Sequence, residues 1–334
     1  MSEGLRGRAF LASALVLGFA ALVGAGTSAG GVNERIAFQA NVKGAKQQIF
    51  TIRPNGKGLR QVTNLRGDPG RGASDPSWSP DGSRIAFNTA TKFGPPLFNR
   101  VNLFTVAPDG NDLTELAIES GNFHGDPAYS PDGLQISFDW DPGRNEPETT
   151  VNGIFIANSD GSNAHRLTTT LSRDTFDTES QWSPDGQTIA FTRVKSDTKA
   201  AIFTIGVDGT NLIQLTPYKL DAASPDWSPD GQTIAFNSYW DSPHGNVSRV
   251  ITMRPDGSEQ KAITRDHFGH GGVIFSFRPS WSPDGRRIVF VRCKVKGDTG
   301  GCDLHTMNPA GRHLERVTKV PDSFPTNPDW GAAP

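Results

Sequence analysis

The sequence predicts an all-β protein, a six-bladed β-propeller whose blades are four-stranded antiparallel sheets. One observation is a tryptophan motif that returns at intervals of about 50 residues. Another is that short runs of Ile, Val, Phe and Thr alternate with Gly, Pro, Asp and Asn, as strands alternate with turns. The third is that the two ends of the repeat array carry complementary parts of one repeat.

The first 29 residues differ in composition from the rest of the 334-residue chain. Arg6 and Arg8 precede an apolar stretch over 9–23, and small residues follow it. This order is typical of a secretory signal peptide, with cleavage expected after Ala25 or Ala29. An uncleaved membrane anchor is the alternative, although a run of about 15 residues is shorter than the roughly 20 that a spanning helix needs. We therefore expect residues 30–334 to be a single exported domain, periplasmic or extracellular, without a transmembrane span.

The repeat is clearest around Trp78, where Asp-Pro-Ser-Trp-Ser-Pro-Asp-Gly is followed by Ile-Ala-Phe. The aromatic residue returns as Tyr129, Trp182, Trp227 and Trp281. Between copies lie two more short strands around a glycine turn, so each unit has four strands: a (with the aromatic residue), b (Ile-x-Phe), c and d. Because the aromatic residue occurs once per blade, we assign it to packing between blades. The Ser-Pro-Asp-Gly segment has the residue pattern of a type I turn.

The ends of the array predict how the ring closes. The chain enters at 34–38, which reads as a strand b without a strand a before it. It leaves at 327–331, which reads as a strand a, with Trp330, and no strand b after it. We expect residues 327–331 to pair with the N-terminal strands b, c and d and complete one blade. This closure hides two strand edges that would otherwise invite aggregation.

This repeat, Pro-x-Trp-Ser-Pro-Asp-Gly-x-x-Ile-Ala-Phe, resembles that of the TolB family of WD-repeat-like propellers, over residues 34–331. The resemblance implies a six-bladed ring. Periplasmic TolB has an α/β domain before its propeller, whereas here we expect the first blade to follow the signal within a few residues, so the TolB role in envelope integrity does not carry over. Similar repeats precede the hydrolase domain of dipeptidyl-peptidase-like enzymes and form propeller lyases that act on pectin fragments.

Charge and motifs exclude several functions. The formal net charge is -2, and a nucleic-acid binder would need an excess of Lys and Arg facing phosphates. The sequence has no Gly-x-Ser-x-Gly nucleophile elbow and no Walker-type glycine loop. These features favour a binding module over an enzyme.

The loops between strands b and c and between strands d and a lie on one face of the ring, which we call the loop face. They are long and variable, and binding residues often lie on such loops. Strand a is innermost, so the residue three positions before its aromatic residue should point toward the mouth of the central channel. These residues are Asp75, Asp126, Glu179, Ser224, Arg278 and Asn327. The carboxylates of Asp75, Asp126 and Glu179 could hold Ca²⁺, the one possible cofactor, or instead cap backbone amides or pair with Arg278.

Histidines and aromatic residues add candidates on the same face. His124, His244, His267 and His270 could assemble a metal site, but His267-x-x-His270 lacks the helix and the glutamate of a zinc-protease motif. Packing and surface roles are the alternative.

Trp140 and the pair Tyr239-Trp240 begin b–c loops beside acidic residues. This placement suits contact with sugars or peptides, or local packing where a strand ends. Our candidate ligand-binding residues are therefore Asp75, Asp126, Glu179, Arg278, His124, Trp140 and Trp240.

Cys293 and Cys302, the only cysteines, flank the last b–c loop. In an exported protein we expect them to form a disulfide that staples this hairpin and contributes roughly 2–3 kcal/mol. Together the sequence predicts an exported monomer that presents its loops to an envelope or extracellular protein or glycan. A metal-assisted glycan lyase or hydrolase at the channel mouth, and a structural spacer without a ligand, are the alternatives.

Overall fold

The computed structural model describes residues 34–42, 45–65, 72–92, 99–118, 123–141, 152–170, 174–195, 199–240, 247–269, 272–296, 299–319 and 324–332. The expected signal peptide, 1–29, lies outside these residues. Apart from one 3-10 turn, η1 (Tyr218–Leu220), the regular structure described is all β-strand. No helix within the described part of the chain is long and apolar enough to cross a membrane.

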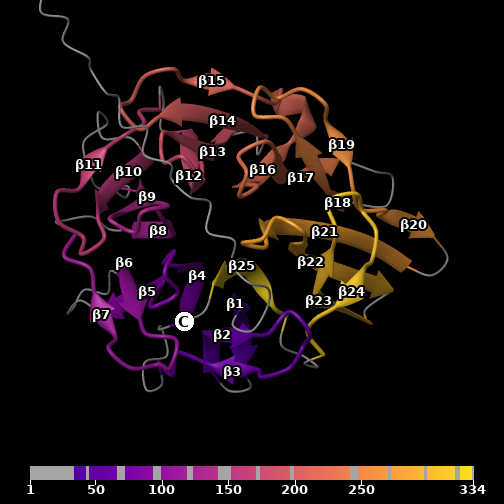
Figure 1. Cartoon of the computed structure of the whole chain (residues 1–334), viewed down its shortest axis with the longest axis horizontal. Helices are drawn as coiled ribbons and strands as arrows, with labels where there is room; N and C mark the ends of the chain where they lie inside the picture. Colours follow the sequence, from indigo (N-terminus) through magenta and orange to yellow (C-terminus); the bar gives the residue numbers. More distant parts are fainter. Residues whose placement is uncertain are drawn as a thin grey trace, which may run out of the picture. The chain divides into compact units, whose positions relative to one another are not determined.

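The strands form six antiparallel blades in the order a, b, c, d from the channel outward (Figure 1), and one parallel pairing, Val101 opposite Phe123, joins blades 2 and 3 into a single sheet. Blade 1 contains β25 (Thr326–Ala332), β1 (Glu34–Val42), β2 (Ala45–Ile52) and β3 (Arg60–Gln61). Blade 2 contains β4 (Ala73–Trp78), β5 (Ile85–Lys92), β6 (Asn99–Val106) and β7 (Thr114–Glu115). Blade 3 contains β8 (Phe123–Tyr129), β9 (Gln135–Asp141), β10 (Gly153–Asn158) and β11 (His165–Arg166).

The second half of the ring repeats this order. Blade 4 contains β12 (Thr175–Trp182), β13 (Thr188–Lys195), β14 (Ala200–Gly206) and β15 (Ile213–Gln214). Blade 5 contains β16 (Ala222–Trp227), β17 (Ile234–Trp240), β18 (Val247–Met253) and β19 (Lys261–Ala262). Blade 6 contains β21 (Gly272–Trp281), β22 (Ile288–Lys296), β23 (Thr299–Met307) and β24 (Glu315–Arg316), with β20 (His267–Gly269) paired to β21. The six-bladed prediction is therefore confirmed.

The C-terminal strand closes the ring. In Figure 1, β25 (yellow) lies beside β1 (indigo), and the two pair antiparallel with Ile36 opposite Trp330. A Cβ atom at Gly331 would overlap the ring of Trp78 in blade 2, so glycine lets the closing strand approach the next blade. The predicted completion of blade 1 by the end of the chain is confirmed.

The core consists of six apolar clusters, each shared by two neighbouring blades. Trp78 of blade 2, for example, packs with Ile49 and Val62 of blade 1. Trp330 of blade 1 packs with Val289 and Leu304 of blade 6. The repeated aromatic residue therefore joins blades, as the sequence predicts.

The Ser-Pro-Asp-Gly turns are structural. In blade 2 the Gly82 N–H donates to the Ser79 carbonyl at 2.9 Å, and the Ser79 hydroxyl donates to Asp81 at 2.6 Å. Gly82 has φ of +71°, which a glycine adopts without strain. The proline of one turn lies near the glycine of the next, since a Cβ at Gly133 would be 3.5 Å from Pro80. Ser, Asp and Gly recur because the turn and its neighbour need them.

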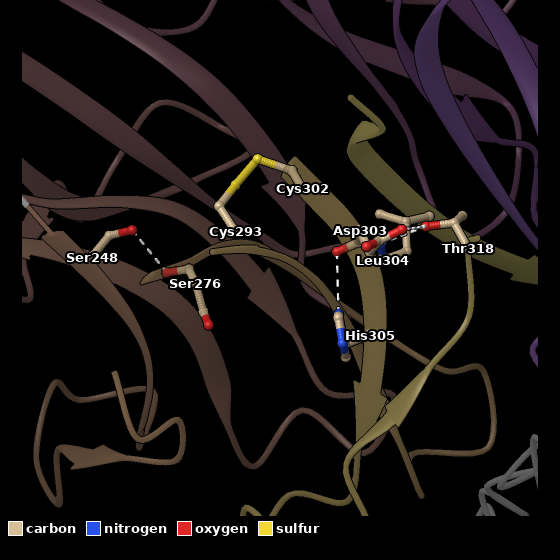
Figure 2. The surroundings of a disulfide bond; sticks show 8 residues. All are labelled: Ser248, Ser276, Cys293, Cys302, Asp303, Leu304, His305 and Thr318. Atoms are coloured by element: carbon tan, nitrogen blue, oxygen red, sulfur yellow. Dashed lines mark hydrogen bonds between the residues drawn. A yellow bond between two sulfur atoms is a disulfide. The ribbon is translucent and has the colours of Figure 1, made fainter. Parts of the chain in front are cut away.

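The predicted disulfide joins Cys293 of β22 to Cys302 of β23, which are directly opposite in register (Figure 2). Cys293 is buried in the cluster between blades 6 and 1. Beside it, the Leu304 N–H donates to the Thr318 hydroxyl at 2.9 Å, which ties strand c to the chain segment after strand d. The disulfide thus reinforces the blade next to the closure.

Replacing Trp330 with alanine should destabilise the ring strongly. The indole is 5% exposed and fills the junction between blades 6 and 1, so its loss leaves a cavity. Core Trp→Ala changes cost about 3–5 kcal/mol, and urea unfolding should show a loss of this size. Leu314→Ala is the control because Leu314 is 49% exposed, and it should change stability by less than about 0.5 kcal/mol. Equal losses in the two variants would contradict closure through Trp330.

Candidate functional site at the channel mouth

Each innermost strand carries a bulge at the same point. In blade 2 the register between β4 and β5 shifts between Ser74 and Ser77. The residue at the bulge is left-handed in every blade, with φ from +42° at Asp126 to +54° at Glu179. Such φ values are uncommon for residues other than glycine, and a bulge redirects the side chain it carries.

The six bulge residues line one cavity of about 70 Å³ at the channel mouth. They are Asp75, Asp126, Glu179, Ser224, Arg278 and Asn327. The structure therefore brings together the six positions that sequence reasoning placed at the mouth. A cavity of this size holds a few water molecules or the head group of one side chain, since a water takes about 30 Å³ in the liquid.

The bulges are held by side chains of the preceding blade. The Asp75 N–H donates to Gln39 Oε1 at 2.7 Å, the Ser224 N–H to Thr192 Oγ1 at 3.0 Å, and the Arg278 N–H to Asn237 Oδ1 at 3.0 Å. Gln39, Thr192 and Asn237 each follow the buried phenylalanine of strand b. Adjacent blades thus fix the backbone that aims the mouth side chains.

Arg278 is the cation of the mouth. Its guanidinium lies 2.8 Å from Glu179 Oε1 and 3.7 Å from Asp126 Oδ1. Burial lowers the pKa of Arg278, but the carboxylates of Glu179, Asp126 and Asp75 raise it above its ordinary value, so the group stays charged. Asp75 accepts hydrogen bonds from Asn88, at 2.8 Å, and from Asn327.

Glu179 and Asp126 therefore pair with Arg278, which is one of the arrangements expected of these acids, whereas Asp75 is held by Asn88 and Asn327. No group of three or more His, Cys, Asp or Glu is arranged to hold a metal ion in the described ranges.

Asp139 is a further carboxyl group near the mouth acids, although it does not line the cavity, and sequence reasoning did not place it there. Asp139 lies on β9 and pairs with Gly125 of β8, the residue that precedes Asp126. Its Oδ1 atom is buried and has no hydrogen-bond partner among the described residues. Burial, with the charges of Asp126 and Asp75, raises the pKa of Asp139 well above its ordinary value. The sequence did carry a signal for Asp139, because it directly follows the phenylalanine of strand b. The residues at this position in other blades, such as Gln39 and Asn237, hold the bulges.

Asp126 is also poised to change charge near neutral pH. Burial and the charge of Asp75 raise its pKa to about 7, while Arg278 opposes this rise. The Thr178 hydroxyl donates to Asp126 at 2.9 Å. The mouth therefore contains carboxyl groups with different protonation behaviour within one small cavity.

Two further acids, Asp226 and Asp329, line the same cavity. Asp226 accepts the Trp281 N–H at 2.6 Å, and Asp329 accepts the Trp78 N–H at 2.6 Å. Burial raises the pKa of Asp226 to about 8 and that of Asp329 to about 6. Both carboxyls join one blade to the next, so they are structural groups inside the channel.

The other sequence candidates lie elsewhere. His124 is buried on β8, with Nδ1 3.3 Å from the Val101 carbonyl and its ring edge-on to Phe138. Trp140 packs on Phe155 at 5.2 Å between ring centres, with Arg166 against the indole.

Neither His124 nor Trp140 lines the cavity at the mouth. The side chains of Trp240 and His267, and all of His244 and His270, lie outside the described residues.

A closed six-bladed ring, built on Trp-Ser-Pro-Asp-Gly turns and with a charged channel mouth, defines a class of repeat propellers. The chain belongs to the TolB β-propeller family, because the TolB beta propeller domain matches residues 112–332. The Uncharacterized protein Atu1656 of Agrobacterium fabrum is 29% identical over 254 residues, covering 71% of this chain and 79% of that protein.

Solved structures share the fold. A putative TolB from Agrobacterium tumefaciens matches with a TM-score of 0.64 at 19% identity, over 91% of this chain and 100% of that chain. TolB from Acinetobacter baumannii matches with a TM-score of 0.65 at 19% identity, over 89% of this chain and 66% of that chain.

The buried acids predict that stability falls as pH rises. The folded-state pKa values of Asp226 and Asp329, about 8 and about 6, lie above the ordinary value of 3.8, so folding takes up protons. The resulting stability is fully present below pH 3.8 and is lost as pH rises through the folded pKa values. Urea unfolding should therefore give a larger free energy of unfolding at about pH 5.5 than at about pH 8.5.

Asp226→Asn keeps an acceptor for the Trp281 N–H but cannot ionise, so it should flatten this slope between about pH 4 and about pH 8. Asp230→Asn is the control, because turn hydrogen bonds lower the pKa of Asp230 and it stays ionised throughout this range. A wild-type slope in Asp226→Asn would show that Asp226 does not titrate as described.

Proposed function

We propose that the protein is an exported, monomeric binding module that engages an envelope or extracellular protein through its loop face and channel mouth. The observation that carries the proposal is the convergence of six left-handed bulge residues on one cavity. Strained backbone that neighbouring side chains hold in place is commonly found at binding sites. The disulfide supports an oxidising compartment, as the signal-like N-terminus does.

The mouth selects for positive charge. Asp75, Asp126 and Glu179 lie around one cation, Arg278, so the carboxyl groups outnumber the guanidinium. A lysine or arginine head group, or an amino terminus, fits both this charge and the small volume. The ligand is thus a protein segment that presents one cationic group to the channel.

Titration calorimetry with a lysine-containing peptide and its Nε-acetylated counterpart tests this proposal. The free lysine peptide should bind and the acetylated one should not, and Glu179→Gln and Asp75→Asn should each weaken binding about fivefold. Asp160→Asn, on the opposite face, is the control and should bind like the wild type. Equal binding of the two peptides would contradict a cation site.

Calcium is a separate arm of the same experiment. Binding of Ca²⁺ with the same dependence on Asp75 and Glu179, together with no peptide binding, would assign the mouth to a metal ion instead. Failure of both probes would favour a structural spacer.

A glycan lyase or hydrolase is the second candidate, and one observation favours it. The pKa of Asp126 is about 7 because of burial and Asp75, and a general acid or base works best near such a value. Turnover of uronate-containing oligosaccharides, with and without a chelator, tests this candidate. Turnover abolished by Asp126→Asn would replace the binding proposal with an enzymatic one, and an absence of turnover would retire the enzyme.

A further inference from the structure

Blade 3 departs from the repeat at two neighbouring positions on the face opposite the loops, which we call the hairpin face. Tyr129 stands where every other blade has tryptophan. Leu134 follows the turn glycine and is 66% exposed, whereas the equivalent residues are polar. These equivalents are Ser83, Gln187, Gln232 and Arg286. Because the other blades fold without Tyr or Leu here, the fold does not explain either residue.

Both residues line a groove between the turns of blades 2 and 3. Its volume is about 620 Å³, and Pro80, Arg84 and Leu116 line it as well. The equivalent groove between blades 3 and 4 lies over Trp182 and measures about 300 Å³. A tyrosine fills less space than a tryptophan, so the groove over Tyr129 is the larger of the two. The larger volume suits a small ligand, since such sites measure roughly 300–1,000 Å³.

Arg84 supplies a positive charge that the fold leaves available. Its guanidinium donates to Thr105 Oγ1 at 3.0 Å and to the Asp112 carbonyl at 2.6 Å. Within the described ranges Arg84 has no carboxylate partner, whereas Arg287, its counterpart in blade 6, lies 2.6 Å from Glu315. Neutral acceptors therefore orient Arg84 without neutralising it.

Carboxylates surround the same groove. Asp81, Asp132 and Asp160 line it, and the hydrogen bonds that each accepts from its own turn lower its pKa. These groups are ionised at neutral pH, so the groove has acceptors on several sides and one charged donor. Tyr129 and Leu134 add apolar surface between them.

We propose that this groove binds a neutral oligosaccharide. A sugar hydroxyl both donates and accepts, so one ligand can satisfy the carboxylates and the guanidinium together. An anionic ligand would be repelled by three carboxylates, and a ligand without hydrogen-bond acceptors would leave the positive charge of Arg84 unmatched. The apolar face of a sugar ring can pack against Tyr129 and Leu134. This site lies on the opposite face from the channel mouth and takes a different class of ligand, so it goes beyond the function proposed above.

Titration of the full chain with cellotetraose, maltotetraose and tetra-N-acetylchitotetraose, followed by saturation-transfer NMR and calorimetry, tests the proposal. At least one of these neutral sugars should bind with a Kd below about 10 mM. Tetragalacturonate, which is anionic, should bind at least about tenfold more weakly, and the cationic tetramer of glucosamine should not bind more tightly than the neutral sugars.

Tyr129→Trp restores the residue of the other blades and should weaken sugar binding about tenfold, while leaving the melting temperature unchanged. Leu134→Ser should weaken binding about fivefold. Leu212→Ser is the matched control, because Leu212 is also exposed, at 47%, but lies in blade 4 and should not affect binding.

Three results would overturn the proposal: no binding of any neutral tetrasaccharide, a preference for a charged one, or wild-type affinity in Tyr129→Trp. If Tyr129→Trp does not fold, sugar binding is measured in Leu134→Ser and Arg84→Gln instead. Wild-type affinity for the sugar in both of these variants overturns the proposal. Glu179→Gln should leave sugar binding unchanged. Loss of sugar binding in that variant would move the sugar to the channel mouth and likewise overturn the proposal.

Discussion

The structure depends on packing between blades, and this packing is complete only because β25 pairs with β1. A single blade cannot bury its own apolar faces, so each needs a neighbour on both sides. Trp330 supplies the inner-strand aromatic residue at the junction of blades 6 and 1, and Gly331 allows Trp78 to approach. The ends of the chain therefore complete the same kind of interface that the rest of the ring repeats.

The channel mouth is a consequence of this closure. Each bulge residue is held in a left-handed conformation, which costs of order 1–3 kcal/mol outside glycine and must be offset by surrounding contacts. In several blades the offsetting contact comes from the blade before, as with Gln39 and Asp75 or Asn237 and Arg278. A site built in this way is rigid, because its side chains cannot turn away without disturbing two blades.

The inner surface of the ring is rich in acids that the fold uses in different ways. Asp226 and Asp329 accept backbone N–H groups across blade junctions, whereas Asp126 and Glu179 pair with Arg278. Burial raises the pKa of Asp126, Asp139, Asp226 and Asp329. The channel thus couples proton uptake to the interfaces that hold the ring together. The hairpin face has the opposite character: the turn carboxylates of Asp81, Asp132 and Asp160 are exposed, and the hydrogen bonds that they accept lower their pKa values.

The sequence by itself determined the number of blades, the closing strand, the disulfide and the six residues at the mouth. These follow from a local pattern that repeats, so position within one unit predicts position in the ring. Only the tertiary structure decided which side chains meet, because the contacts join residues of different blades. It brought the buried Asp139 near Asp126, packed His124 and Trp140 against neighbours, and placed Arg278 among the acids. It also showed that Tyr129 lines a groove, which the sequence could not show because the groove forms between the turns of two neighbouring blades.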